Sequence, residues 1–219
     1  MPGPGEPTGL HAGEPTGLRA LRRQRTHDAL SAAAITLFLE RGFDAVSVAE
    51  IAAAAAVSKP TLFAYFPTKE DLVLHRILDH RGEAARVVRA RTPGVAPLAA
   101  HLLAGLDCRE PVTGLNDDPE VLAYHAMVFA TPSLLGRLAQ HAAGDEHALA
   151  EALAEAAPQA GELTARLAAA QIIVVQRVLA RENWARLRAG EGAAARHPTA
   201  VEATRQAFAA LRRALPDYS

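Results

Sequence analysis

The sequence predicts an all-α protein of about nine helices, with a small three-helix domain ahead of a larger helical domain. Apolar side chains recur every three or four residues through most of the 219 residues, which is the period of an amphipathic helix. Serine, threonine, proline and glycine stand between these periodic runs, where such residues begin or end helices. No run shows the alternation of apolar and polar residues that is typical of a half-buried strand.

The chain opens with residues 1–18, which are rich in Gly and Pro and contain an eight-residue repeat. Repeated Gly and Pro disfavour a packed helix, so we expect a disordered tail here. The first helix is expected at residues 19–41, and Gly42 follows it as a C-terminal cap. Its apolar face consists of Leu30, Ala33, Ala34, Leu37 and Phe38.

Residues 47–66 predict two short helices joined by a tight turn. Ser47 and Glu50 form a capping box, because each can satisfy an unpaired backbone N–H of the other. Ser58 caps the second helix, and Pro60 fits its first turn because that position needs no backbone donor. This pattern indicates a helix-turn-helix.

The second of these helices has two different faces. Leu62 and Phe66, four residues apart, are expected to face the core. A lysine on the other face could reach guanine or phosphate, small side chains could reach a thymine methyl, and a tyrosine could donate to a phosphate. This face therefore suits the major groove of DNA, although a helical hairpin without nucleic acid is the alternative. It consists of Lys59, Pro60, Thr61, Ala64 and Tyr65.

Further cations flank this motif. Thr68 and Asp71 predict the start of the next helix, which places Lys69 at a helix N-terminus, where anions are attracted. Four arginines precede or open the first helix, and they are suited to the phosphate backbone: Arg19, Arg22, Arg23 and Arg25.

Charge is distributed unevenly along the chain. Residues 19–69 carry a net charge of +3 and residues 70–219 a net charge of −2, within a total of −1. A basic segment on a mildly acidic body is typical of a DNA-reading protein, whereas a non-specific architectural DNA binder would be far more basic. The single cysteine, Cys108, allows no intramolecular disulfide. The absence of a secretion signal and of a long uncharged run favours a cytoplasmic location without a membrane partner.

The remainder of the chain is expected to be helical. A glycine- and proline-rich loop is predicted at residues 110–119, and another at residues 190–198. We therefore expect the helix-turn-helix domain at residues 19–68 and a second domain at residues 69–219. The expected helices of the second domain are 69–91, 95–107, 120–130, 134–156, 162–189 and 199–215.

Residues 19–75 resemble the DNA-binding domain of the TetR family of bacterial transcriptional regulators. The resemblance implies a symmetric homodimer that binds a palindromic DNA operator, usually as a repressor released by a small molecule. It rests on residues 33–38 (AAITLF), 41–43 (RGF), 47–52 (SVAEIA), 57–66 (VSKPTLFAYF) and 69–72 (KEDL).

The resemblance also implies roles for particular residues. Base or nearby phosphate contacts fall on Lys59, Pro60, Thr61 and Tyr65, and backbone contacts on Thr26, Ser47, Phe63 and Lys69. Arg25, Ser58 and Ala64 complete the predicted DNA-binding set. Two residues depart from the family pattern. Ala56 stands where glycine is usual in the turn, and Phe63 stands where tyrosine is common.

The last two long helices are candidates for the dimer interface. Residues 162–189 include a stretch that is apolar nearly all round, so one face can serve the core and the other a second subunit. Burial of both faces within one chain is the alternative. The predicted interface residues are Val174, Val178, Thr204, Phe208 and Leu211.

The resemblance further implies an effector pocket between the central helices. His125 and Gln171 are its candidate polar anchors, with a satisfied core position as the alternative for each. Residues 118–137 are loosely similar to a TetR subgroup linked to acyl-coenzyme-A-like ligands, which predicts an elongated hydrophobic effector. The predicted lining is Leu102, Leu106, Val121, His125, Val128, Phe129, Gln171 and Val175.

The nine histidines invite a rival interpretation as a helical metalloenzyme. However, His75 and His80 are five residues apart and His141 and His147 six, so neither pair has the i, i+4 spacing that places two ligands on one helix face. We therefore expect no metal site, no cofactor and no enzymatic activity. The effector, the operator, the target genes and the sign of regulation are not determined by the sequence.

Overall fold

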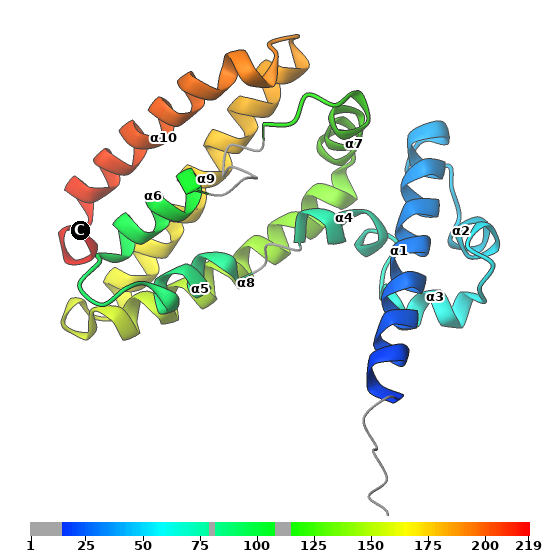
Figure 1. Ribbon diagram of the computed structural model, residues 1–219, viewed down its shortest axis with the longest axis horizontal. Coiled ribbons are helices and arrows are strands. Elements are labelled where there is room, and N and C mark those ends of the chain that lie inside the picture. The colour runs from blue at the N-terminus through cyan, green and yellow to red at the C-terminus, as the bar shows by residue number, and fades with distance from the viewer. Residues whose placement is uncertain (1–14, 79–81, 108–114) are drawn as a thin grey trace, which may run out of the picture. The chain divides into compact units, whose positions relative to one another are not determined.

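The computed structural model describes residues 15–78, 82–107 and 115–219, and all regular structure within these ranges is helical (Figure 1). These residues form ten α-helices and two short 3₁₀ helices, so the all-α prediction is confirmed. The chain divides into two compact units, Met1–Val73 and Leu74–Ser219.

The first unit contains α1 (Pro15–Arg41), α2 (Val48–Ala54), α3 (Lys59–Tyr65) and the start of α4 (Asp71–Leu78). Helix α1 begins at Pro15, four residues before the expected start, so only residues 1–14 of the predicted tail lie outside the described part. A proline is tolerated there because the first helical residue needs no N–H donor. The core of this unit includes Leu30, Ala34, Ile35, Phe38, Val46, Ile51, Leu62 and Phe66.

The helix expected at residues 69–91 is instead two helices, α4 and α5 (Glu83–Ala90). Gly82 has a φ of +66°, which is incompatible with a continuing right-handed helix. Its N–H donates to Asp145 Oδ1 at 3.0 Å, a partner 63 residues away on α8 (Pro132–Ala156). Periodicity alone predicted one helix because the apolar pattern continues on both sides of this break.

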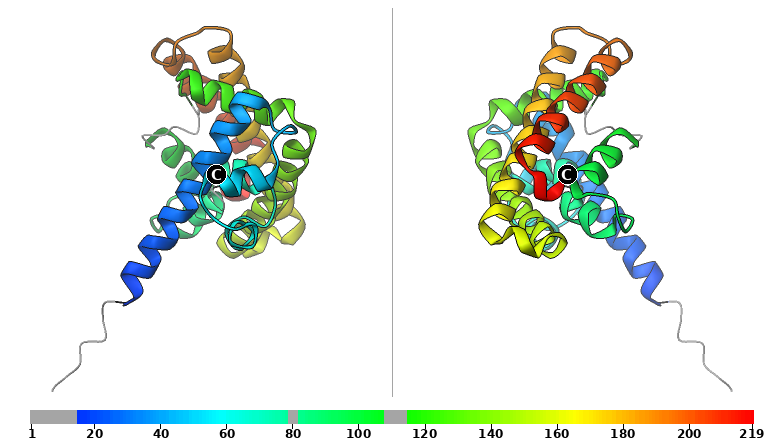
Figure 2. Two further views of the ribbon diagram at one scale, coloured as in Figure 1. Left: turned by 90° about the vertical axis from the view of Figure 1, so that its right-hand side faces the viewer. Right: turned by 90° about the vertical axis from the view of Figure 1, so that its left-hand side faces the viewer.

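The second unit also contains α6 (Pro97–Asp107), α7 (Pro119–Ala130), α9 (Glu162–Arg188) and α10 (Ala193–Ala214). Helices α8 and α9 are joined by a short turn and pack against each other, with α5 along α8 and α10 along α9 (Figures 1 and 2). Gly144 does not interrupt α8. Their shared core includes Leu149, Leu153, Ala168, Ile172, Phe208 and Tyr218.

Helix α10 begins at Ala193, six residues before the expected start, and includes Pro198. Two long-range contacts hold its first turns. Asp117 Oδ2 accepts the Ala193 N–H at 2.8 Å, and the buried Arg196 donates from Nε to Asn183 Oδ1 at 3.1 Å. A proline normally interrupts a helix, and these distant partners offset its effect.

Helix α9 is long and apolar enough to cross a membrane by length and composition alone. In the structure one face of α9 packs on α8 and α10. The opposite face leaves large apolar side chains exposed, and a helix of this kind is also found in the core of proteins that never enter a membrane.

His101 on α6 is a buried titratable group. It is 3% exposed, and burial lowers the pKa of its imidazole from 6.5 to about 4, against a weaker opposing effect of the Ala84 carbonyl and Glu83. Because the folded pKa lies below the unfolded one, the stability that neutral His101 contributes is complete above pH 6.5 and is lost as the pH falls towards 4.

We predict that His101→Gln lowers the acid sensitivity of the fold. Glutamine cannot be protonated in this range, so the variant should lose about 3 kcal/mol less unfolding free energy than the parent between pH 7 and pH 4. Urea denaturation at a series of pH values measures this. His147→Gln, at an exposed position on α8, is the control. Parallel acid profiles for parent and His101→Gln would contradict the prediction.

Candidate nucleic-acid interface and effector site

The start of α2 is held by a complete capping box. The Ser47 N–H donates to Glu50 Oε2 at 2.8 Å, and the Glu50 N–H donates to Ser47 Oγ at 3.3 Å. Arg41 Nη1 lies 2.8 Å from Glu50 Oε1. The hydrogen bonds from Ser47 and then the Arg41 guanidinium hold the pKa of Glu50 at about 2. The carboxylate therefore stays ionised and fixes α2 to the end of α1.

Helix α3 is capped as predicted, because the Thr61 N–H donates to Ser58 Oγ at 3.2 Å. The two hydroxyls of Ser58 and Thr61 lie 2.7 Å apart. Leu62 is completely buried and Phe66 is 2% exposed, which fixes the core side of the helix. The opposite side is exposed and consists of Lys59, Pro60, Thr61, Phe63 and Ala64, with Tyr65 half-buried at its edge.

Helix α1 runs beside this face. The guanidinium of Arg23 lies 5.4 Å from the Tyr65 ring centroid, and the His27 ring lies 4.5 Å from that of Phe66. The predicted set of DNA-binding residues did not include Arg23, although Arg23 belongs to the arginine cluster that the sequence showed ahead of the helix-turn-helix. Arg19, Arg22 and Arg23 share a helix face with Thr26 by their spacing, whereas Arg25 lies on another side of α1.

Lys69 has a structural role that sequence reasoning missed. Its ammonium donates to the Phe43 carbonyl and lies 4.3 Å from the Phe43 ring centroid and 5.5 Å from that of Phe38. The predicted cap is present, because the Asp71 N–H donates to Thr68 Oγ1 at 3.2 Å. Lys69 therefore ties the start of α4 to the end of α1.

The turn between α2 and α3 contains Ala56 at a φ of +52°, a non-glycine residue in the left-handed region. The Val57 N–H donates to the Ala52 carbonyl at 2.9 Å across this turn. Glycine, which is usual at this position in the family, adopts a positive φ without steric cost, whereas the Cβ of Ala56 carries a conformational cost.

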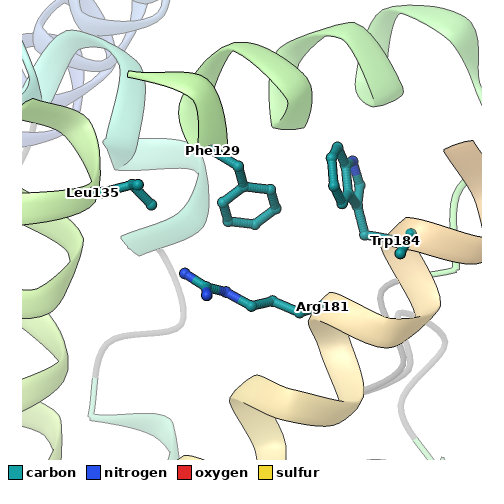
Figure 3. Close-up of a pocket in the computed structure, with 5 residues that line it drawn as sticks. Phe129, Leu135, Arg181 and Trp184 are labelled. Carbon is teal, nitrogen blue, oxygen red and sulfur yellow. The ribbon is translucent and has the colours of Figure 1, made fainter. Parts of the chain in front are cut away.

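The second unit contains a cavity of about 210 Å³ between the α7–α8 junction and the last turns of α9 (Figure 3). Only Phe129 of the predicted pocket residues lines it. The other four were missed because only the packing of α7 against α8 and α9 brings them to Phe129. The full lining is Phe129, Leu135, Arg181, Trp184 and Ala185.

The other predicted pocket residues lie elsewhere. Val128 is completely buried, and Leu102 and Val175 pack against the core. Val121 and His125 are half-buried on α7, where the His125 ring nitrogen bonds the Val121 carbonyl at 2.9 Å. Gln171 as a pocket anchor is wrong, because it is exposed and its amide donates to the Leu167 carbonyl at 3.2 Å. The side chain of Leu106 and all of Cys108 lie outside the described residues.

The predicted dimer residues separate into two groups. The prediction of an interface role is wrong for Thr204, Phe208 and Leu211. These side chains are 2%, 2% and 5% exposed within one subunit, so they offer no surface to a partner. Val174 and Val178 are exposed on α9. The four- and three-residue spacing of Thr204, Phe208 and Leu211 on α10 therefore reflects packing inside the subunit.

Comparison with known proteins agrees with this geometry. Residues 30–75 match the family model described as bacterial regulatory proteins, tetR family. The chain is 29% identical over 180 residues to the HTH-type transcriptional regulator TcmR of Streptomyces glaucescens, which is 78% of each protein. It is 42% identical over 57 residues to the HTH-type transcriptional regulator YdeS of Bacillus subtilis (strain 168), which is 26% of this chain and 29% of YdeS.

The fold is also similar to that of a solved structure, GusR of Salmonella enterica. The TM-score is 0.52 at 20% identity, over 94% of this chain and 100% of that one.

A capped helix-turn-helix with an exposed second helix, joined to a larger helical unit, defines a helix-turn-helix transcriptional regulator. Residues 30–75 match the DNA-binding domain of the TetR family of these regulators. The named relatives are transcription regulators, which agrees with the expectation that the chain has no enzymatic activity.

We predict that Ala56→Gly stabilises the protein by about 0.5–1 kcal/mol, because glycine adopts a positive φ without steric cost. Thermal and urea denaturation measure the change. Ala53→Gly is the matched control, since Ala53 is exposed inside α2, and glycine there should destabilise by about the same amount. Destabilisation by both substitutions would show that the turn does not favour glycine.

Proposed function

We propose that the protein is a ligand-responsive repressor that acts in the cytoplasm on a palindromic operator. The observation that carries the proposal is the division of α3 into a buried side, Leu62 and Phe66, and an exposed side of small, polar and aromatic residues. Such a helix can enter the major groove without exposing core residues.

We assign DNA contacts to the exposed side of α3 and to cations around it. Lys59 serves bases or a nearby phosphate, and Pro60, Thr61, Ala64 and Tyr65 line the groove. Contacts to the DNA backbone are assigned to Arg25, Thr26, Ser47, Ser58, Phe63 and Lys69. Lys69 would use the ammonium donors that do not bind the Phe43 carbonyl. Arg23 joins this set because it lies over Tyr65.

A second subunit is required to read both halves of a palindrome. We propose that it packs on the exposed face of α9, defined here as the α9 stripe: Leu163, Leu167, Val174 and Val178. These residues are 42% to 68% exposed and are spaced four, seven and four apart, so they share one side of the helix. That side is opposite the buried Ala165, Ala168 and Ile172. Such an exposed row of large apolar side chains indicates an interface.

Release from DNA would then follow from a population shift. An effector bound in the second unit favours a dimer geometry whose two α3 helices do not match the operator spacing, and it must bind that geometry more tightly to shift the equilibrium. A continuous helix over residues 69–91 cannot transmit this change, because α4 and α5 are separate. Helix α4, which contains the boundary between the two units, is the element that would transmit the change.

The effector chemistry predicted from residues 118–137, an acyl-coenzyme-A-like molecule, stays a prediction. The cavity beside Phe129 supports a small, largely apolar effector, since apolar pockets with few polar groups commonly bind one.

DNase footprinting on the region upstream of the protein's own gene tests the proposed function. Protection of one short palindrome supports a regulator. Uniform coating of all DNA would favour an architectural binder, and absence of binding at low ionic strength would overturn the proposal.

We predict that Lys59→Gln weakens operator binding and flattens its salt dependence. Loss of one phosphate contact should reduce the slope of log K against log salt by about 0.9, whereas loss of a base contact mainly reduces specificity. Fluorescence anisotropy with labelled operator at several salt concentrations gives the slope. Arg205→Gln, at an exposed position on α10, should leave it unchanged. Equal slopes and affinities for parent and Lys59→Gln would exclude Lys59 from the interface.

We predict that Val178→Asp dissociates the dimer, because a carboxylate in the centre of an apolar interface loses its hydration. Sedimentation velocity should show a shift from dimer to monomer at micromolar concentration, with the helical circular dichroism retained. Ala123→Asp, at an exposed position on α7, should remain dimeric. A Val178→Asp protein that stays dimeric would place the interface elsewhere.

A further inference from the structure

Two aromatic rings and the guanidinium of Arg181 line the cavity between α7, α8 and α9, and a second guanidinium, that of Arg188, lies over one of these rings. Phe129 and Trp184 are in edge contact, with ring centroids 5.0 Å apart and planes at 75°. Arg181 lies 5.4 Å from the Phe129 centroid, and Arg188 lies 5.3 Å from the Trp184 centroid. Figure 3 shows the Arg181 side chain running from α9 beneath the Phe129 ring, on the side of Leu135.

Neither guanidinium has a carboxylate partner within the part of the chain that the structure describes. Other arginines of the second unit do have one. Arg186 pairs with Glu182 on the same helix at 2.8 Å, and Arg89 makes a two-point pair with Glu155. Glu182, the acidic residue nearest in sequence to Arg181, is thus already paired with Arg186. The positive charge of Arg181 is therefore available to an anionic ligand.

The cavity walls favour a flat ligand. Phe129, Leu135, Trp184 and Ala185 supply apolar surface, and a ring placed among them can make the edge-to-face contacts that aromatic pairs prefer. A guanidinium is itself flat, stacks on aromatic rings and binds a carboxylate through two parallel hydrogen bonds. An aliphatic chain would gain only the apolar part of these interactions.

We infer that this cavity binds a planar aromatic carboxylate, with its ring among Phe129, Leu135 and Trp184 and its carboxylate on Arg181. The inference rests on the proposed function, since it specifies the chemical class of the effector. Arg181 and Ala185 follow Val178 by three and seven residues, so they continue the α9 stripe. A ligand at this position would therefore bear directly on the proposed dimer contact.

The chain provides its own reporter, because Trp184 is the only tryptophan and lines the cavity. The probes are 4-nitrobenzoate, its uncharged counterpart 4-nitrobenzamide, and octanoate as a flexible anion. Calorimetry on the full chain gives each affinity, and quenching of Trp184 fluorescence locates the nitroaromatic probes. We expect 4-nitrobenzoate to bind about tenfold or more tightly than either of the other two compounds.

Substitution then tests the anchor. Arg181→Gln should weaken 4-nitrobenzoate by about tenfold or more while changing 4-nitrobenzamide by less than about twofold. Arg166→Gln, an exposed arginine near the other end of α9, should change neither. Equal binding of 4-nitrobenzoate and octanoate would overturn the aromatic part of the inference. Equal binding of acid and amide, or an unaffected Arg181→Gln, would overturn the anionic part.

Operator binding without any probe separates this inference from the proposed function. Intact operator binding together with no response to 4-nitrobenzoate overturns the effector class and leaves the regulator in place. Loss of operator binding in the parent protein overturns the regulator itself. Binding of 4-nitrobenzoate only to the monomeric Val178→Asp variant would show that the second subunit occupies the cavity, which also overturns the inference.

Discussion

The burial of one side of α3 is the constraint on which the first unit depends. Leu62 and Phe66 lie in the core, and the His27 ring of α1 packs against Phe66. Because a seven-residue helix has little stability alone, this packing and the Ser58 cap hold it in place. The same packing decides which side chains remain outside. The proposed DNA-facing surface is therefore a consequence of core formation, and Arg23 of α1 lies over the Tyr65 ring beside it.

In the second unit, helix α9 is the element whose buried side determines which residues stay exposed, as α3 does in the first unit. It packs on α8 and α10 with small side chains, Ala165, Ala168 and Ala169, which allow close approach. Its opposite side exposes apolar residues, and its last turns line the cavity. One helix thus contributes to the subunit core, the proposed dimer contact and the proposed effector site. A ligand that moves α9 would change the dimer directly, which gives the population shift a physical route.

Several helix ends depend on partners distant in the sequence. Asp145 holds Gly82, Asp117 holds the first turn of α10, and Lys69 joins two helices through the Phe43 carbonyl. Periodicity and local caps carry no information about such partners. This is why residues 69–91 were predicted as one helix and why α10 was predicted to begin six residues late. Where the cap is local, as at Ser47 and Ser58, the predicted start was correct.

The amino-acid sequence by itself determined the helical class, the helix-turn-helix and the exposed residues of α3, because caps and helical periodicity act over a few residues. Only the tertiary structure decided which apolar faces are covered. Phe208 and Leu211 lie in the core, whereas Val174 and Val178 are exposed. Leu135 and Trp184, which are distant in the sequence, line the same cavity. An apolar face has the same sequence pattern whether its own chain or another covers it, since burial depends on the packing of whole helices.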